Sequence, residues 1–463
     1  MQYIENRTYQ EIAIGDSADL VRYLKAEDIE LFAGMSGNAN PAHLDAEYAN
    51  SDSFQKVISH GMWGGSLIAA VIATELPGPG TIFINQSLHF LKPVGIGDCV
   101  TVRVTVSEKK PDARVLLICD CINQAGETVI EGEAEVRAPT EKVKRPRALL
   151  AEAHLHQTGQ QYQQLIRATK HLDPIPTAVV HPCDTTSLLG ALESAEQNLI
   201  LPILVGPETK IRAAAKVAGR SLDGYQIVDV PHSHAAARRA VELVREGAVA
   251  ALMKGKLHTD EIMEAVIDKV SGLRTERRIS HVFALDVPSY PKPLMITDAA
   301  INIYPDLNDK RDIIQNAIDL AHALGIPLPK VAILSAVETI YPKIASTIDA
   351  AALCKMADRG QITGGLLDGP LAFDNAISKS AAETKGIQSV VAGDADVLIA
   401  PDLEAGNMIA KQLIYLAGAE SAGIVLGARV PIILTSRADG TLSRLASSAL
   451  ALLYAHYTLK SKP

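Results

Sequence analysis

Two polar groups in the first third of the chain are of types that could act on a carbonyl substrate. His43 follows Asn38 by five residues in a turn-rich segment, and a histidine there could exchange a proton with water or substrate. Gly61 opens an apolar run expected to form a buried helix over 61–75, and the unpaired N–H groups at a helix start can stabilise an oxyanion. A loop histidine beside Asn-Pro often only braces a turn, so the spacing alone leaves a structural role open.

Six polar clusters follow apolar segments in the second half. The run 253–259 (MKGKLHT) holds two lysines, a histidine and a threonine at an expected strand-to-helix junction, which suits a phosphate or an acyl phosphate. Thr259 could equally be no more than an N-cap. Taken singly, each cluster is compatible with a cap, a turn or a solvated charge. The candidate residues are Lys254, Lys256, His258, Thr259, Arg277, Arg278, Asp298, Asn302, Asp374, Asn407, Ser436 and Arg437.

Two halves with different hydrophobic periods would position these residues. From 80 to 137 apolar and polar residues alternate, which predicts antiparallel strands and, with the helix over 61–75, an α+β unit. After residue 175 short aliphatic runs alternate with helical patterns, which predicts a largely parallel sheet in two α/β lobes with a cleft between them. The expected domains are 1–138 and 173–463, with a linker and lead-in helix over 139–172.

Composition narrows the function classes. The chain has 463 residues, a net charge of -9 and five scattered cysteines without zinc-site spacing. We therefore expect a cytoplasmic protein with reduced thiols and no metal site, and neither nucleic acid nor membrane as partner. Neither GxxxxGK[ST] nor GxGxxG after a strand occurs, which argues against ATP-driven and Rossmann-type hydride chemistry.

Residues 10–137 resemble a MaoC-type (R)-specific enoyl-CoA hydratase of the hot-dog fold. The matching motifs are 36–43 (SGNANPAH), 60–62 (HGM) with Ser66, and 90–94 (FLKPV) followed by Gly97-Asp98. The resemblance implies that His43 holds the attacking water, that the backbone of Gly61 forms the oxyanion hole, and that Ser66 belongs to the substrate site. Asn38 stands where the family has an aspartate, and an amide can orient water but cannot accept its proton. A weakened hydratase, an acyl-CoA-binding domain and a related thioester reaction all remain open.

From about 175 to 460 the sequence resembles the phosphate acetyl/butyryltransferase family, and its butyryl side in particular. The matching motifs are 254–259 (KGKLHT), 368–374 (DGPLAFD), 401–408 (PDLEAGNM) and 435–439 (TSRAD). The family's reaction converts acyl-CoA and phosphate to acyl phosphate and CoA by direct attack. The resemblance implies that Ser436 positions the CoA thiol and Arg437 holds phosphate. It also implies a substrate site formed by Lys254, Lys256, His258, Thr259, Asn302, Asp374 and Asn407.

Both halves thus point to short acyl-CoA thioesters. We expect a fused enzyme with coenzyme A and phosphate as substrates, no bound cofactor, and assembly as a homodimer or higher homo-oligomer. Two alternatives stay open. The first half could be a non-catalytic acyl-CoA-binding and oligomerisation module, and the second half could be a metal- and NAD-dependent enzyme like the decarboxylating dehydrogenases.

Overall fold

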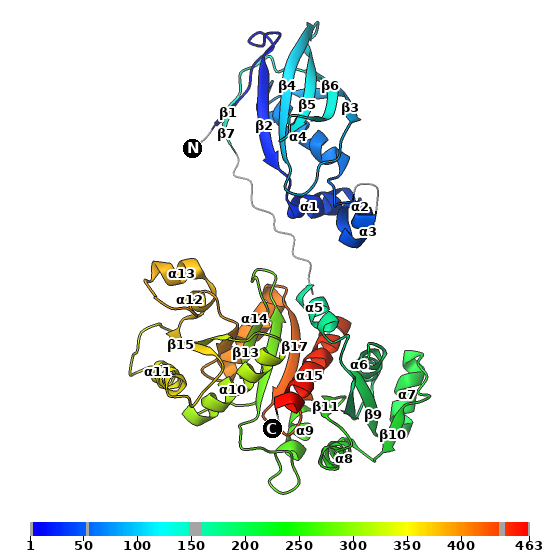
Figure 1. Cartoon of the computed structure of the whole chain (residues 1–463), viewed down its shortest axis with the longest axis vertical. Helices are drawn as coiled ribbons and strands as arrows, with labels where there is room; N and C mark the ends of the chain where they lie inside the picture. Colours follow the sequence, from blue (N-terminus) through cyan, green and yellow to red (C-terminus); the bar gives the residue numbers. More distant parts are fainter. Residues whose placement is uncertain (1–2, 52–54, 148–159, 435–439, 462–463) are drawn as a thin grey trace. The chain divides into compact units, whose positions relative to one another are not determined.

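The computed structural model describes residues 3–51, 55–147, 160–434 and 440–461. The chain divides into two compact units, Met1–Leu155 and His156–Pro463, drawn in Figure 1 in blue to cyan and in green to red. None of the helices in the described part of the chain combines the length and the apolar character needed to span a lipid bilayer.

Unit 1 is a five-stranded antiparallel sheet packed against one buried helix, the arrangement of a hot-dog fold. Its strand order is β2-β4-β5-β6-β3, and α4 packs against β4 and β5. The predicted helix over 61–75 is confirmed as α4, which ends before Pro77. The elements are β1 (Tyr3–Glu5), β2 (Ser17–Tyr23), α1 (Ala26–Ser36), α2 (Pro41–Leu44), α3 (Ala46–Ser51), α4 (Gly61–Thr74), β3 (Ile82–Phe90), β4 (Cys99–Lys110), β5 (Arg114–Asn123), β6 (Thr128–Arg137) and β7 (Lys144–Pro146).

Alternation along β4 explains how this sheet forms a core. Val100, Val102, Val104 and Val106 are buried, whereas Arg103 between them is exposed and pairs with Asp19 on β2. Successive side chains of a strand point to opposite faces, so this pattern gives β4 one apolar face and one polar face. The apolar face packs on α4.

The segment over 139–172, expected to be a linker and a lead-in helix, is divided between the two units. Residues 144–146 form β7 and pair with β1, and the Asn6 side chain donates to the carbonyl oxygen of Glu141. Further along, α5 (Gln160–Ala168) packs on the last helix of unit 2. The first part of the expected linker is therefore integrated into unit 1, and the lead-in helix belongs to unit 2.

Unit 2 is built on one sheet of eleven strands in the order β10-β9-β8-β11-β18-β17-β12-β13-β16-β14-β15. Seven of its ten neighbouring pairs are parallel, which confirms the largely parallel sheet. The strands are β8 (Ile175–Val180), β9 (Ile200–Gly206), β10 (Gln226–Asp229), β11 (Ala251–Lys254), β12 (Ser280–Asp286), β13 (Leu294–Thr297), β14 (Lys330–Leu334), β15 (Leu366–Leu371), β16 (Val397–Ile399), β17 (Glu420–Leu426) and β18 (Ile432–Ile433).

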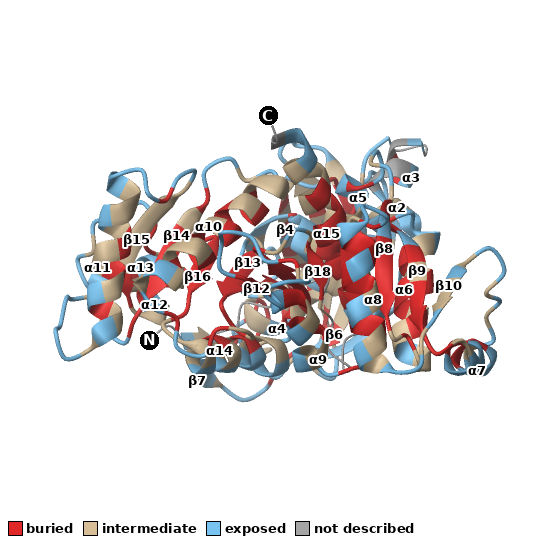
Figure 2. Ribbon diagram, turned by 90° about the horizontal axis from the view of Figure 1, so that it is seen from below, coloured by how far each residue is buried: buried red, intermediate tan, exposed pale blue. Residues whose placement is uncertain are grey.

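Helices connect most of these strands, as the alternating pattern predicts, but β12 leads directly to β13 and β17 directly to β18. Figure 2 colours most of β8, β9 and β18 as buried and much of the outer helices as exposed. The helices after α5 are α6 (Thr185–Glu196), α7 (Glu208–Ala218), α8 (Ser233–Arg245), α9 (Thr259–Ile267), α10 (Leu307–Ala323), α11 (Ala345–Asp358), α12 (Phe373–Ile377), α13 (Lys379–Thr384), α14 (Leu403–Leu416) and α15 (Thr441–Ser461).

Three antiparallel pairings in the middle of the sheet reverse the strand direction. β18 pairs antiparallel with β17, β17 with β12, and β12 with β13. After three reversals, β13 and the strands beyond it run opposite to β11 and β18. The two parallel blocks therefore present the carboxyl ends of their strands at opposite edges of one sheet. Their division into two lobes around a cleft stays a prediction.

Candidate functional site

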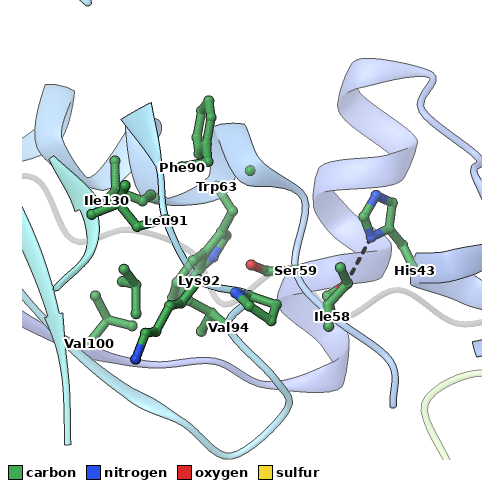
Figure 3. Close-up of a pocket in the computed structure, with 14 residues that line it drawn as sticks. His43, Ile58, Ser59, Trp63, Phe90, Leu91, Lys92, Val94, Val100 and Ile130 are labelled. Carbon is green, nitrogen blue, oxygen red and sulfur yellow. Dashed lines mark hydrogen bonds between the residues drawn. The ribbon is translucent and has the colours of Figure 1, made fainter. Parts of the chain in front are cut away.

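A cavity of about 260 Å³ lies in unit 1 between α2, the start of α4 and the end of β3 (Figure 3). Its walls are mostly apolar, and its few polar groups include His43, Ser59 and the backbone at Gly61. Such a pocket suits an apolar chain that carries one polar head. The lining residues are His43, Ile58, Ser59, Gly61, Trp63, Gly64, Phe90, Leu91, Lys92, Pro93, Val94, Val100, Val129 and Ile130.

His43 is held at this cavity by a short capped helix. The Asn40 side chain accepts a hydrogen bond from the N–H of Ala42 at 3.1 Å, and Pro41 occupies the first turn of α2. The Nδ1 atom of His43 lies 2.9 Å from the carbonyl oxygen of Ile58. Because a carbonyl only accepts, neutral His43 carries its proton on Nδ1 and keeps a lone pair on Nε2. The ring can therefore act as a base through Nε2.

His60 is a second histidine of this site, and its place in the sequence predicts no functional role for it. Its ring lies 3.9 Å from that of His43, centroid to centroid, and its Nε2 donates to the backbone oxygen of Asn38 at 3.0 Å. Burial lowers the pKa of His60, and the nearby His43 lowers it further. His60 is therefore a neutral brace. Its position as the N-cap of a buried apolar helix was the available signal.

Of the expected pair Asn38 and His43, only His43 lines the cavity. The Asn38 side chain is exposed, accepts a hydrogen bond from the N–H of Asn40 at 3.3 Å, and does not line the cavity. What Asn38 gives the site is its backbone oxygen, which fixes His60. Replacement of the family aspartate by an amide therefore leaves His43 without a carboxylate at that position.

Of the other two residues expected in the site of unit 1, Gly61 lines the cavity and Ser66 does not. Gly61 begins α4 and lines the cavity, and a Cβ built there would lie 3.1 Å from the Phe90 ring. The exposed Ser66 lies one turn further along α4, where its hydroxyl donates to the backbone oxygen of Trp63 at 2.6 Å. Ser66 does not line this cavity.

In unit 2, the predicted strand-to-helix junction over 253–259 is present. β11 ends at Lys254 and α9 begins at Thr259. The N-cap of α9 is His258, whose N–H donates to the Glu261 carboxylate at 3.0 Å. The alternative role of Thr259 as the N-cap is therefore wrong, because Thr259 is the first helical residue. The first turn of α9 follows directly on the loop that carries Lys256, and N–H groups at a helix start favour an anion.

This junction is fixed by the loop that follows β8. The N–H of Gly255 donates to the oxygen of Val180, and the N–H of Lys256 donates to that of His181, both at 2.9 Å. In return the Nδ1 atom of His181 donates to the oxygen of Lys256 at 2.6 Å. A Cβ at Gly255 would lie 2.4 Å from the oxygen of Val180, so only glycine allows this approach. His181 itself has a φ of 58°, an unusual conformation for histidine.

Asn302 and Asn407 lie at the opposite edge of the sheet, after β13 and β16. Asn302 is 2% exposed; its Nδ2 donates to Asp298 and to the oxygen of Ile279, and its Oδ1 accepts from Arg278. The Asn407 side chain donates to the oxygen of Ala299 at 3.0 Å. Both amides thus hold neighbouring loops at the end of the sheet opposite to Lys254.

Asp374 is exposed in the first turn of the five-residue helix α12. It forms an ion pair with Lys385 at 3.2 Å, and this contact lowers the pKa of its carboxyl. The N-cap of this helix is Ala372, so Asp374 does not cap it. Two further predictions, for Ser436 and Arg437, lie outside the described residues. The residue before that segment, Leu434, follows β18, which runs parallel to β11 and leaves the sheet at the same edge as Lys254.

Comparisons with known proteins match each unit separately. A family model described as "MaoC like domain" matches residues 10–116, and one described as "Phosphate acetyl/butaryl transferase" matches residues 232–452. A phosphate acetyltransferase from Rhizobium meliloti is 64% identical over 294 residues, which are 64% of this chain and 93% of that protein. A phosphate butyryltransferase from Clostridium beijerinckii is 41% identical over 294 residues, 64% of this chain and 97% of that protein.

A solved structure is also similar to unit 2. The crystal structure of a branched-chain phosphotransacylase from Enterococcus faecalis V583 matches with a TM-score of 0.54 and 27% identity. The match covers 61% of this chain and 99% of that one.

Proposed function

The chain belongs to the phosphate acetyl/butyryl transferase family, with a MaoC-like domain fused ahead of it, and we propose that unit 2 transfers a short acyl group between coenzyme A and phosphate. The observation that carries this proposal is the 64% identity with a phosphate acetyltransferase over 93% of that protein's length. CoA and phosphate act as substrates, and the reaction needs no resident cofactor.

In the proposed reaction a phosphate oxygen attacks the thioester carbonyl, the new C–O bond forms, and the C–S bond breaks to release CoA as a thiolate that takes up a proton. Arg437 holds phosphate and stabilises the negative charge of the tetrahedral transition state. Ser436 donates a hydrogen bond to the departing sulfur. Support comes from the strand directions, because Leu434 and Lys254 leave the sheet at the same edge.

The start of α9 supplies the rest of the proposed anion site. Lys254 and Lys256 contribute positive charge, and His258 and Thr259 open the helix whose N–H groups favour an anion. The interlocked backbone of Gly255, Lys256 and His181 holds this loop before substrate arrives, which reduces the ordering cost of binding.

We assign supporting roles to the residues at the end of the sheet opposite to Lys254. Asn302 and Asn407 support the loops around Asp298 and the start of α14, and the two parallel blocks form the lobes of a cleft. Asp374, paired with Lys385, lies at the rim of that cleft. The enzyme works in the cytoplasm as a homodimer or higher homo-oligomer.

We propose acetyl as the preferred group among the short acyl chains. The chain is 64% identical to the phosphate acetyltransferase from Rhizobium meliloti and 41% identical to the phosphate butyryltransferase from Clostridium beijerinckii. The test is a panel of C2 to C6 acyl-CoAs with phosphate, in which release of free CoA is measured for each chain length. A kcat/KM for acetyl-CoA below that for butyryl-CoA would overturn the acetyl preference while leaving the transferase reaction intact.

For unit 1 we propose that the cavity binds the acyl chain of a 2-enoyl-CoA and that His43 acts there as the base. The specific support is the lone pair left on Nε2 of His43 and the helix start at Gly61 in the same cavity. A full-length protein that leaves the enoyl absorbance of crotonyl-CoA unchanged would overturn the hydratase activity. Binding of crotonyl-CoA without that loss would instead identify a binding domain.

A further inference from the structure

Unit 2 contains a second, larger cavity at the edge of the sheet opposite to Lys254. Its volume is about 520 Å³, and it lies between the end of α9, the loop over 274–279 and the start of α10. We call this cavity the basic groove. It is lined by four cationic side chains, three carboxylates and several neutral residues: Lys269, Arg274, Arg277, Arg278, Glu276, Asp309, Asp312, Ile267, Thr275, Ile279, Ile301 and Asn302.

The loop that carries these arginines is pinned to the turn after β17. The Thr275 hydroxyl donates to the oxygen of Gly427 at 2.7 Å, and the N–H of Arg429 donates to the oxygen of Leu273 at 3.0 Å. Gly427 has a φ of 86°, and a Cβ there would lie 2.4 Å from the oxygen of Arg278. The Asn316 side chain donates to that same oxygen at 2.9 Å. These contacts therefore fix the backbone of the loop that forms one wall of the basic groove.

The four cations differ in their existing partners. Arg277 is paired with Asp319, and Arg278 lies 3.5 Å from Asp309. Lys269 and Arg274 are exposed and have no acidic partner among the described residues. A lysine and an arginine without acidic partners on one concave surface are suited to a phosphate group, because arginine can hold two of its oxygens at once.

The groove is connected to a buried polar chain. Arg278 donates through Nε to Oδ1 of Asn302 at 2.6 Å, and the Nδ2 of Asn302 donates to Asp298 at 2.5 Å. Asp298 is 3% exposed and also accepts from the N–H groups of Ala300 and Ile301. The carbonyl of Ala299, in the same loop, accepts from Asn407 on α14. A ligand at Arg278 would thus contact a network that reaches the start of α14.

We propose that the basic groove is a second anion site of unit 2, separate from the transferase site and specific for a phosphate-bearing ligand. Lys269 and Arg274 supply the uncommitted charge, Arg278 supplies a guanidinium anchored by Asn302, and the pinned loop fixes the backbone of Arg274 and Arg278. The same chemistry fits inorganic phosphate, pyrophosphate or the phosphates of a nucleotide. Nothing in this proposal depends on which acyl group the transferase uses.

The test measures binding of three probes to the full chain by isothermal titration calorimetry: inorganic phosphate, pyrophosphate and ADP. The protein carries Arg437→Gln, which removes the proposed phosphate ligand of the transferase site. The double variant Lys269→Gln/Arg274→Gln is then introduced into it. Neither position belongs to the transferase site, and both are exposed, so the fold is retained. We expect the Kd of at least one probe to rise by at least about tenfold.

A matched double variant, Lys216→Gln/Arg359→Gln, removes the same charge from exposed positions on α7 and after α11. It should leave every Kd unchanged. The probe that depends on Lys269 and Arg274 identifies the source of the phosphate. Equal Kd values with and without Lys269 and Arg274 for all three probes would overturn the proposal, and so would an equal loss in the control.

Discussion

The rings of His43 and His60 lie 3.9 Å apart, and they donate to different backbone carbonyls, those of Ile58 and Asn38. The two histidines therefore have different surroundings and different hydrogen-bond partners. His60 is buried and its Nε2 donates to the backbone, whereas His43 lines the cavity and uses its Nδ1 for the backbone contact. An amide at position 38 stands where the family motif has a carboxylate, and the first two predictions test what this change means for His43.

The first prediction concerns His43. His43→Gln keeps a polar side chain but removes the base, so any hydration of crotonyl-CoA should fall by about 10²- to 10⁴-fold. The rate is followed by loss of the enoyl absorbance. His89→Gln on the exposed part of β3 is the control, and its rate should match that of the parent. Equal rates for the His43 and His89 variants would remove His43 from the mechanism.

The second prediction concerns the missing carboxylate. Asn38→Asp places a carboxylate five residues before His43, and hydratase activity should rise by about 10²-fold or more when this side chain turns from its exposed position toward the water at His43. Asn40→Asp is a poor control because Asn40 caps α2, whereas Asn308→Asp makes the same change at an exposed position in the first turn of α10 in unit 2. No gain from Asn38→Asp would show that the exposed position of this side chain excludes it from the cavity.

The third prediction tests the close pairing of β3 and β6 at Gly132. A Cβ at this residue would lie 2.0 Å from the backbone oxygen of Ser87, so Gly132→Ala must separate the two strands. We expect a loss of about 3 kcal/mol in the free energy of unfolding of unit 1. Trp63, the single tryptophan of the chain, is buried in unit 1, so its fluorescence reports that unit in a urea titration.

The control for Gly132 is Gly34 in α1, where a Cβ would meet nothing within 4 Å. Gly34→Ala should change the stability of unit 1 by no more than about 1 kcal/mol, because alanine favours a helix. If the two substitutions shift the tryptophan transition equally, the described approach of β3 to β6 is wrong.

The fourth prediction is a pH dependence of unit 2. His281 is fully buried, neither ring nitrogen has a partner among the described residues, and burial lowers its pKa to about 3. The folded state keeps the ring neutral, while the unfolded chain takes up a proton below its ordinary pKa of about 6.5. Stability is therefore lost as the pH falls below 6.5, by about 2 kcal/mol at pH 5 from this residue.

His281→Leu replaces the ring with an apolar side chain and should remove this part of the pH dependence. The measurement is urea unfolding at pH 7.5 and pH 5.0, followed by far-UV circular dichroism. His171→Gln, at an exposed position, is the control and should keep the pH dependence of the parent. A His281→Leu protein that loses as much stability on acidification as the parent would contradict the assignment.

Local patterns of the fold were predictable, and long-range pairings were not. The alternation over 100–106 gave β4, and the apolar run with Pro77 beyond it gave α4, because both depend on neighbouring residues. The reversal at β17 and β12 depends on which strands meet across the sheet, and no periodicity within Glu420–Leu426 reports that. The opposite placement of Lys254 and Asn302 follows from that reversal.

Some site residues could likewise be predicted from local sequence, and others could not. His43, Gly61 and the junction at Lys254 sit where local sequence places them, beside a capped helix or a strand end. The contribution of Asn38 could not be read from its side chain, because it acts through its backbone oxygen on His60. Ser66 is turned onto the backbone of Trp63 by its place in α4, a contact that motif matching does not reveal.

The most direct test of the central claim, acyl transfer to phosphate by unit 2, is release of CoA from acetyl-CoA with and without phosphate, with acetyl phosphate quantified in parallel. The account predicts CoA release that requires phosphate and equals the acetyl phosphate formed. Arg437→Gln should lower that rate by about 10²- to 10³-fold, and Arg359→Gln should not. CoA release that proceeds equally without phosphate, or that yields no acetyl phosphate, would contradict it.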